Sequence, residues 1–281
     1  MSHHPDVQLE IVEVSTRGDR DRGVPLHQAG GVGLFVKELE YALLDDEIDL
    51  AVHSLKDMPS RTPPRLSLAA VPERADPRDT LISQAGLELS ELLPGSRVGT
   101  GSPRRRAQIL ALRPDLEVVG IRGNVDTRLS KVQEAAYDAV VLAAAGLDRL
   151  GRRDAITQVF APEMILPAAG QGALAVELRA DDEATHALVA PVNHPPSWAA
   201  VGAERAFMAR LGAGCHVPAA AYALVTEREI WLRCLVADLD GEKILRGERR
   251  GAIDEAAFLG KSVAEELLGR GAGQLLREAE S

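Results

Sequence analysis

Side chains that bind anions gather at one predicted turn between a strand and a helix. The stretch at 98–106 reads VGTGSPRRR, in which a serine precedes a proline that suits the first turn of a helix. Free backbone N–H groups and the helix dipole attract an anion there, whereas arginines are unfavourable unless an anion offsets their charge. The pattern indicates an anion site, against the alternative that the arginines point into water. The candidate residues are Thr100, Ser102, Arg104 and Arg105.

Arginines also follow the next two predicted strands. Arg122 and Arg128 flank the turn after the strand at 116–121, and Arg149 comes shortly after the strand at 139–143. A guanidinium binds a carboxylate through two parallel hydrogen bonds, so arginines at three successive strand ends favour a pocket for a small polyanion. Only five of the 32 basic residues are lysines, and a GC-rich coding sequence would also enrich arginine, so composition alone leaves both explanations open.

The sequence HSLKD at 53–57, which ends a predicted buried strand, indicates a second kind of chemistry. Asp57 would lie at the carboxyl end of that strand with Lys56 beside it and Ser54 close by. A carboxylate next to a cation at a strand end is a candidate catalytic group. The alternative is an ordinary loop residue that caps a turn.

The two cysteines need separate explanations, because two are too few for a disulfide framework. Cys215 lies in the glycine-rich loop LGAGCHVP, where an accessible thiol could be a nucleophile or an attachment point, although an isolated cysteine is more often buried. A cysteine hydrolase that uses Cys215 and His216 is disfavoured, because adjacent side chains seldom face each other as nucleophile and base. Cys234 shares a strand face with Ile230 and Leu232, which predicts core packing.

Composition limits the class of function. The chain has 281 residues, of which 46% are hydrophobic and 26% charged, an ordinary globular balance. A formal charge of −10 argues against a nucleic-acid binder, since such proteins neutralise phosphates with basic surfaces. We expect a cytoplasmic, monomeric protein without an export signal or a membrane span. The histidine spacing and the glycine pattern predict neither a metal site nor a nucleotide site.

The elements that position these side chains alternate between strands and helices over the first two-thirds of the chain. This alternation predicts an α/β fold with mostly parallel sheets, in which ligands bind beyond the carboxyl ends of the strands. After about residue 193 the pattern changes to that of a small α+β domain with a hairpin turn at Asp240 and Gly241. The expected strands are 7–14, 49–53, 66–71, 96–99, 116–121, 139–143, 217–224, 229–237 and 243–248, and the expected helices are 33–44, 104–112, 124–135, 197–211 and 254–279, the last with a break near 269–273.

Taken together and in order, the motifs resemble the porphobilinogen deaminase family over essentially the whole chain. One motif alone would be weak evidence, but all of them in register are highly specific. They are STRGD at 15–19, LFVKELE at 34–40, HSLKD at 53–57, GTGSPRR at 99–105, RGN at 122–124, GQGA at 170–173 and GC at 214–215.

The resemblance implies two periplasmic-binding-protein-like α/β lobes and a small C-terminal α+β domain. The first lobe would comprise residues 1–72 and 173–192, the second residues 73–172, and the cofactor-attachment domain residues 193–281. The implied enzyme is a transferase of porphyrin and haem biosynthesis. It deaminates porphobilinogen and condenses four molecules of it head to tail on a covalent dipyrromethane primer, then releases hydroxymethylbilane by hydrolysis.

The resemblance also assigns residue roles. A thioether to dipyrromethane falls on Cys215, and the catalytic carboxylate falls on Asp57, which among many cations should stay ionised and stabilise a cationic intermediate. Each pyrrole unit carries an acetate and a propionate, so the growing chain is a polyanion that suits arginine. The residues implied to contact the cofactor are Ser54, Lys56, Thr100, Ser102, Arg104, Arg105, Arg122 and Gly172, and those implied to contact the substrate are Arg17, Arg128 and Arg149.

Three departures from the family pattern leave alternatives open. The family's first strand and helix would precede Met1, which suggests a start placed too late or an impaired form. Gln28 and Val32 stand where many members have lysines, and the loop before Cys215 reads GAG rather than EGG. The alternatives are a truncated, inactive relative and a two-lobed anion-binding protein without chemistry, although the latter class usually carries an export signal.

Overall fold

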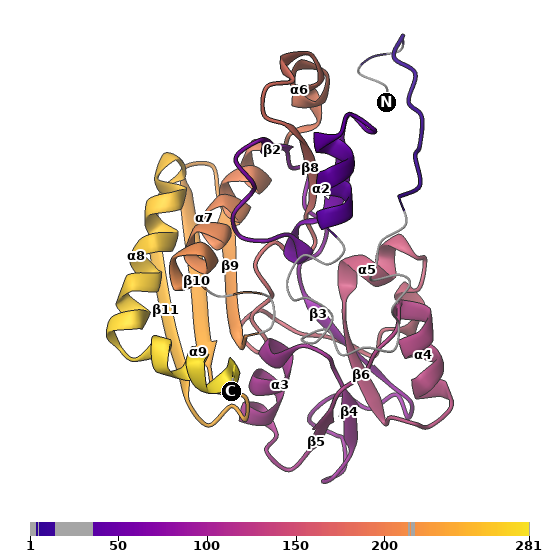
Figure 1. The fold of residues 1–281 in the computed structure, drawn as a ribbon. Coiled ribbons are helices and arrows are strands. Elements are labelled where there is room, and N and C mark those ends of the chain that lie inside the picture. The colour runs from indigo at the N-terminus through magenta and orange to yellow at the C-terminus, as the bar shows by residue number, and fades with distance from the viewer. Residues whose placement is uncertain (1–3, 5, 15–35, 213, 215–216, 281) are drawn as a thin grey trace.

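Three β-sheets organise the described part of the chain in the computed structural model, which describes residues 4, 6–14, 36–212, 214 and 217–280. Figure 1 shows one sheet at the top, a second below it and a third to the left, each with helices packed against it. The predicted α/β class with a small additional C-terminal domain is confirmed.

The upper sheet has the strand order β1-β8-β2, and β8 is antiparallel to both neighbours. This sheet and the helices around it are here called lobe 1. The prediction of mostly parallel sheets is therefore wrong for lobe 1, because the chain that returns from the second sheet runs opposite to β1 and β2. The bounds of its elements are α2 (Lys37–Leu44), β1 (Ala51–Ser54), η1 (Leu55–Asp57), β2 (Leu66–Ala70), β8 (Leu174–Arg179), α6 (Glu183–Val189) and η3 (Ala190–Val192).

The lower sheet, here called lobe 2, has the order β5-β4-β6-β3-β7, with β4 parallel to β5 and β6 and β3 antiparallel to β6 and β7. Leu81 and Val141 belong to the core on one face, and Ile82 and Val140 to the core on the other, so the central strands are apolar on both sides. The bounds are β3 (Asp79–Ser83), β4 (Arg97–Gly99), α3 (Pro103–Leu112), β5 (Glu117–Val119), α4 (Val125–Gln133), β6 (Ala139–Ala143), α5 (Ala144–Arg149), η2 (Arg153–Ala155) and β7 (Gln158–Val159).

The C-terminal sheet is an antiparallel meander in the order β11-β10-β9, with α7 and α8 packed on one face. The predicted strand at 229–237 is confirmed, and so is the break in the last helix, where Gly271 has a φ of 101°. The other face of the sheet packs on α3 of lobe 2 through Leu235 and Ala107. The bounds are α7 (Pro195–Leu211), β9 (Ala219–Val225), β10 (Glu229–Ala237), β11 (Ile244–Ala252), η4 (Ile253–Glu255), α8 (Ala256–Gly269) and α9 (Ala272–Glu280).

Two segments connect the lobes: 71–78 carries the chain from β2 to β3, and 160–173 carries it back from β7 to β8. Arg74 in the first segment donates from Nη1 and Nη2 to the two carboxylate oxygens of Glu204 on α7, at 2.6 and 3.1 Å, and from Nε to the carbonyl of Gln171 at 2.8 Å. Glu204 also accepts hydrogen bonds from the backbone N–H groups of Gly170 and Ala223, at 2.7 and 2.8 Å. One ion pair thus joins both connecting segments to the C-terminal domain.

The prediction of a strand at 7–14 is wrong for the described residues. This segment has no sheet partner, and Leu9 and Ile11 are 83% and 92% exposed. Alternating apolar residues form a strand only where a neighbouring strand accepts their hydrogen bonds and a core covers one face. Conversely, β3, β7 and β8 were not predicted from the sequence.

Candidate functional site

The GQGA turn at 170–173 lies where lobe 1, lobe 2 and the first connecting segment meet. The carbonyl of Ala173 accepts a hydrogen bond from the N–H of Leu55 in η1, at 3.0 Å. The carbonyl of Gly172 accepts one from the N–H of Ala75 at 3.2 Å and another from Nη2 of Arg149 at 2.8 Å. The turn therefore brings η1, which contains Asp57, close to an arginine of lobe 2.

Gly172 has no room for a side chain. Its φ is +85°, and a Cβ there would lie 2.5 Å from the carbonyl oxygen of Ala75, so the backbone itself would have to move. We expect Gly172→Ala to cost about 1–3 kcal/mol more in unfolding free energy than Gly86→Ala. Gly86 is a matched control because its φ is +71° and its Cβ would meet nothing within 4 Å. Chemical denaturation of both variants measures the difference, and equal losses would contradict a steric role for Gly172.

Asp79 is the centre of a buried network beside this turn. Its carboxylate is fully buried and accepts hydrogen bonds from Nη1 of Arg104 (2.7 Å), Nε and Nη2 of Arg105 (2.9 and 2.7 Å) and Nε2 of Gln171 (2.9 Å). Burial alone would raise the pKa of Asp79, but the two guanidiniums outweigh it and hold the pKa well below its usual range. Asp79 is therefore an ionised counter-charge inside the protein.

Helix α3 begins as its sequence predicts. Ser102 is the N-cap and accepts a hydrogen bond from the N–H of Arg105, Pro103 occupies the first turn, and the hydroxyl of Thr100 accepts from the N–H of Ser102 at 3.1 Å. Arg104 and Arg105 are 4% and 6% exposed, so the alternative that these arginines point into water is excluded. They turn inward toward Asp79 instead.

Lys56 and Asp57 reach the same region from η1. Burial lowers the pKa of Lys56, and so do Arg105 and Arg104, whereas Asp57 and Asp79 raise it. Asp57 itself is exposed. Lys56 therefore lies within electrostatic reach of the candidate catalytic carboxylate and of Arg104 and Arg105.

The remaining predicted arginines differ in their surroundings. Arg128 is half-buried and donates from Nε to the carbonyl of Gly123 at 2.8 Å, and burial followed by the charge of Arg105 lowers its pKa. The charge of Arg105 thus reaches Arg128, while Arg149 of α5 donates a hydrogen bond to the carbonyl of Gly172 in the GQGA turn. Arg122 is exposed in the turn before α4, and Ser54 is half-buried at the end of β1.

Comparison with known proteins gives this geometry a context. Residues 1–187 match the family model described as "Porphobilinogen deaminase, dipyromethane cofactor binding domain". Residues 198–269 match a second model, described as "Porphobilinogen deaminase, C-terminal domain". The chain belongs to the porphobilinogen deaminase family. A porphobilinogen deaminase of Roseiflexus castenholzii is 49% identical over 97% of this chain and 90% of its own length, and one from Roseiflexus sp. is 49% identical over 98% and 90%.

Solved structures give weaker likenesses. An arginine-specific periplasmic binding protein of Salmonella typhimurium is 15% identical, with a TM-score of 0.34 over 56% of this chain and 70% of that protein. The probable amino-acid transporter extracellular-binding protein of Bacillus subtilis is 13% identical, with a TM-score of 0.35 over 54% and 66%.

Several residues implied by the porphobilinogen deaminase resemblance lie outside the described part of the chain. These are Cys215, Arg17 and the departures at Gln28 and Val32, together with His216. Cys234 is described, and its predicted core packing is confirmed: it is 2% exposed in the core beneath α7 and α8, and burial raises the pKa of its thiol well above the usual value.

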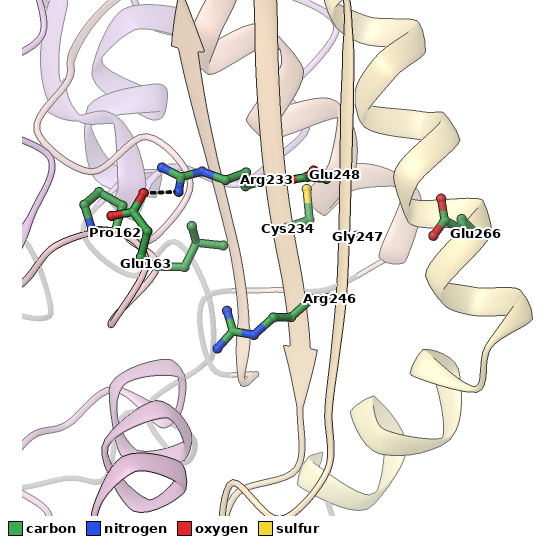
Figure 2. Close-up of a pocket in the computed structure, with 9 residues that line it drawn as sticks. Pro162, Glu163, Arg233, Cys234, Arg246, Gly247, Glu248 and Glu266 are labelled. Carbon is green, nitrogen blue, oxygen red and sulfur yellow. Dashed lines mark hydrogen bonds and ion pairs between the residues drawn. The ribbon is translucent and has the colours of Figure 1, made fainter.

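A hollow of about 370 Å³ lies away from the predicted site residues, between the second connecting segment and the C-terminal sheet. Figure 2 shows Arg233 of β10 reaching across it to Glu163, while Arg246 of β11 points into the open space. Of the predicted site residues that the structure describes, none lines this hollow. In the described ranges, no helix is long and apolar enough to cross a bilayer, and no cluster of three or more acidic, histidine or cysteine side chains could hold a metal.

Two buried residues at the candidate site were not predicted from the sequence as functional residues. Asp79 contacts Arg104 and Arg105 of α3 across 25 and 26 positions, and Gln171 contacts Asp79 across 92. The signals in the sequence were weak: Asp79 stands before an apolar run, and Gln171 lies between the two glycines of the GQGA motif.

Proposed function

We propose that this chain is a transferase that condenses porphobilinogen into hydroxymethylbilane, with Asp57 as the catalytic carboxylate. The observation that carries the proposal is the position of Asp57 at the end of η1, directly after β1 and beside Lys56, a side chain that the charges of Asp57, Arg104 and Arg105 all reach. A carboxylate there suits a reaction that passes through a cation, and the cations suit a substrate that carries carboxylates.

Asp57 would act on the pyrrole nitrogen of the substrate. When the bond between the aminomethyl carbon and its nitrogen breaks, ammonia leaves and positive charge develops on the pyrrole, which the Asp57 carboxylate stabilises. The free α-carbon of the acceptor pyrrole then forms the new carbon–carbon bond and loses its proton. Water ends the sequence by hydrolysing the link to the primer.

The cationic side chains fit a dipyrromethane cofactor, because its acetate and propionate groups need hydrogen-bond donors with positive charge. Bound through a thioether to Cys215, dipyrromethane supplies the primer on which the pyrroles are joined. Ser54, Lys56, Thr100, Ser102, Arg104, Arg105, Arg122 and Gly172 would surround the cofactor, and Arg17, Arg128 and Arg149 would bind the incoming substrate.

The wider setting is part of the same proposal. We place the enzyme in the cytoplasm as a monomer that acts on a small molecule and binds no nucleic acid, in line with its charge of −10. The two lobes would comprise residues 1–72 with 173–192 and residues 73–172, and the cofactor-attachment domain residues 193–281.

Intact-protein mass spectrometry of the chain, expressed in a haem-synthesising host, tests the proposal. We expect the wild type to carry the added mass of two linked pyrrole units, because the site assembles its own primer. Cys215→Ala should lose all of this mass, and Cys234→Ala, which removes the buried thiol, should keep it. An unmodified but folded wild type without turnover would favour an inactive relative or a binding protein instead.

A further inference from the structure

The carboxylate of Asp79 is buried and charged, and the reaction described above does not use it. It is the first residue of β3, directly after the connecting segment 71–78, and its carboxylate has no exposed surface. We propose that Asp79 is a positioning residue, whose carboxylate holds the guanidiniums of Arg104 and Arg105 in the orientation that binds the carboxylate groups of cofactor and substrate. This inference rests on the proposed function of that site.

The contacts of Arg105 fix its guanidinium at every nitrogen. Nε and Nη2 donate to Oδ1 of Asp79, and Nη1 donates to the carbonyl of Val141 at 2.9 Å. Nη2 also lies 3.4 Å from the side-chain oxygen of Gln171. These bonds use four of the five N–H donors, and a long side chain held in this way loses little further entropy when a ligand binds, so the remaining N–H on Nη1 is preorganised.

Arg104 is held differently, and its contacts leave capacity unused. Its Nη1 is shared between Oδ2 of Asp79 and the carbonyl of Leu166, at 2.7 and 2.8 Å. Its Nε is buried and makes no hydrogen bond to the described residues. One carboxylate thus keeps two guanidiniums of consecutive helix residues side by side, although their charges repel each other.

The buried network carries a net positive charge, which favours the binding of an anion. Asp79 offsets one of the two guanidiniums and Asp57 offsets the ammonium of Lys56, so one guanidinium charge remains in excess. Unpaired buried charge is costly, so this region gains stability when carboxylate groups arrive. Asp79 lowers the cost of burying the arginines while leaving a net attraction for the ligand.

The charge of Asp79 acts on Lys56 as well as on the two arginines, and the resemblance places Lys56 among the cofactor contacts. The charged groups that act on Lys56 are Arg104 and Arg105 of α3, Asp57 of η1 and Asp79 of β3. Because Asp79 raises the pKa of Lys56, removal of its charge lowers that pKa further. Lys56 then loses its proton at a lower pH, and the alkaline limb of kcat/KM moves in the same direction.

The experiment compares wild type, Asp79→Asn and Asp79→Glu by cofactor loading, kcat, KM and the pH profile, after circular dichroism has established folding. Asp76→Asn is the matched control, since Asp76 lies three residues before Asp79 on the first connecting segment and pairs with Arg78, at 2.6 Å, rather than with Arg104 and Arg105. For Asp79→Asn we expect KM for porphobilinogen to rise at least about tenfold, with kcat per molecule of cofactor-loaded enzyme within about threefold of the wild type, because ground-state binding is lost. The fraction of Asp79→Asn that carries the cofactor should fall, and the alkaline limb of its kcat/KM profile should shift to lower pH.

Asp79→Glu keeps the charge but displaces the carboxylate by one methylene. We expect it to fold even if Asp79→Asn does not, to raise KM by about three- to tenfold and to leave the alkaline limb in place. A folded Asp79→Glu with wild-type KM and loading, or a folded Asp79→Asn with an unmoved limb and KM, overturns the proposal. A wild type without loading or turnover refutes the proposed function instead, and that result is independent of Asp79.

Discussion

Asp57→Asn is expected to lower kcat for hydroxymethylbilane formation by about 10²–10³-fold while changing KM little. The amide keeps the size of the side chain at the end of η1 and removes the negative charge. The carboxylate is needed only when positive charge develops on the substrate pyrrole, so its loss raises the barrier without weakening ground-state binding. Single-turnover kinetics with protein reconstituted with dipyrromethane measures the effect.

Asp115→Asn provides the control for this substitution. Asp115 is an exposed residue after α3, paired with Arg113 at 2.6 Å, and we expect its amide variant to keep kcat within about twofold of the wild type. If Asp57→Asn raised KM and left kcat unchanged, Asp57 would be a binding residue and the catalytic assignment would be wrong.

The second large effect is expected for Arg74→Ala, which removes one partner of the pair that joins both connecting segments to α7. The side chain of Glu204 is fully buried, so without Arg74 its carboxylate keeps only the two backbone N–H donors of Gly170 and Ala223. We expect a loss of about 3–5 kcal/mol in unfolding free energy, since removal of one member of a buried pair leaves an uncompensated charge. That loss corresponds to a decrease in Tm of roughly 6–20 °C.

Differential scanning calorimetry of Arg74→Ala and Arg210→Ala measures this effect against a matched pair on the same helix. Arg210 on α7 pairs with Glu265 at 3.2 Å, but both side chains are about half exposed, and we expect its removal to cost less than about 1 kcal/mol. Equal Tm shifts for the two variants would mean that the Arg74 pair has no special role in joining the segments.

Local patterns in the sequence were sufficient where neighbouring residues determine the structure. Ser102 and Pro103 define the start of α3 by themselves, because an N-cap and a first-turn proline act within four residues. The alternation of 229–237 predicted β10 correctly, since one of its faces is packed beneath α7 and α8. The core position of Cys234 followed from the same alternation.

Pairings over long sequence distances could not be predicted in this way. The arginines of α3 were correctly singled out as charged groups of interest, but nothing near them in the sequence reveals that Asp79 accepts their hydrogen bonds. The direction of β8 also depends on where the chain returns after lobe 2, so a prediction of parallel strands was wrong for lobe 1. The segment at 7–14 shows the opposite case, in which a local alternation has no neighbour to pair with in the part of the chain that the structure describes.

The antiparallel pairing of β1 with β8 has a consequence during synthesis. His53 in β1 and Glu177 in β8 are joined by a buried hydrogen bond of 3.0 Å and lie 124 positions apart. At roughly 5–20 residues per second, a ribosome needs about 6–25 s to make the intervening chain. All five strands of lobe 2 lie within that interval, so lobe 2 can fold while β1 and β2 still await their central strand. The nascent chain therefore exposes the unpaired, apolar strand edges of β1 and β2 to chaperones and proteases until β8 has been translated.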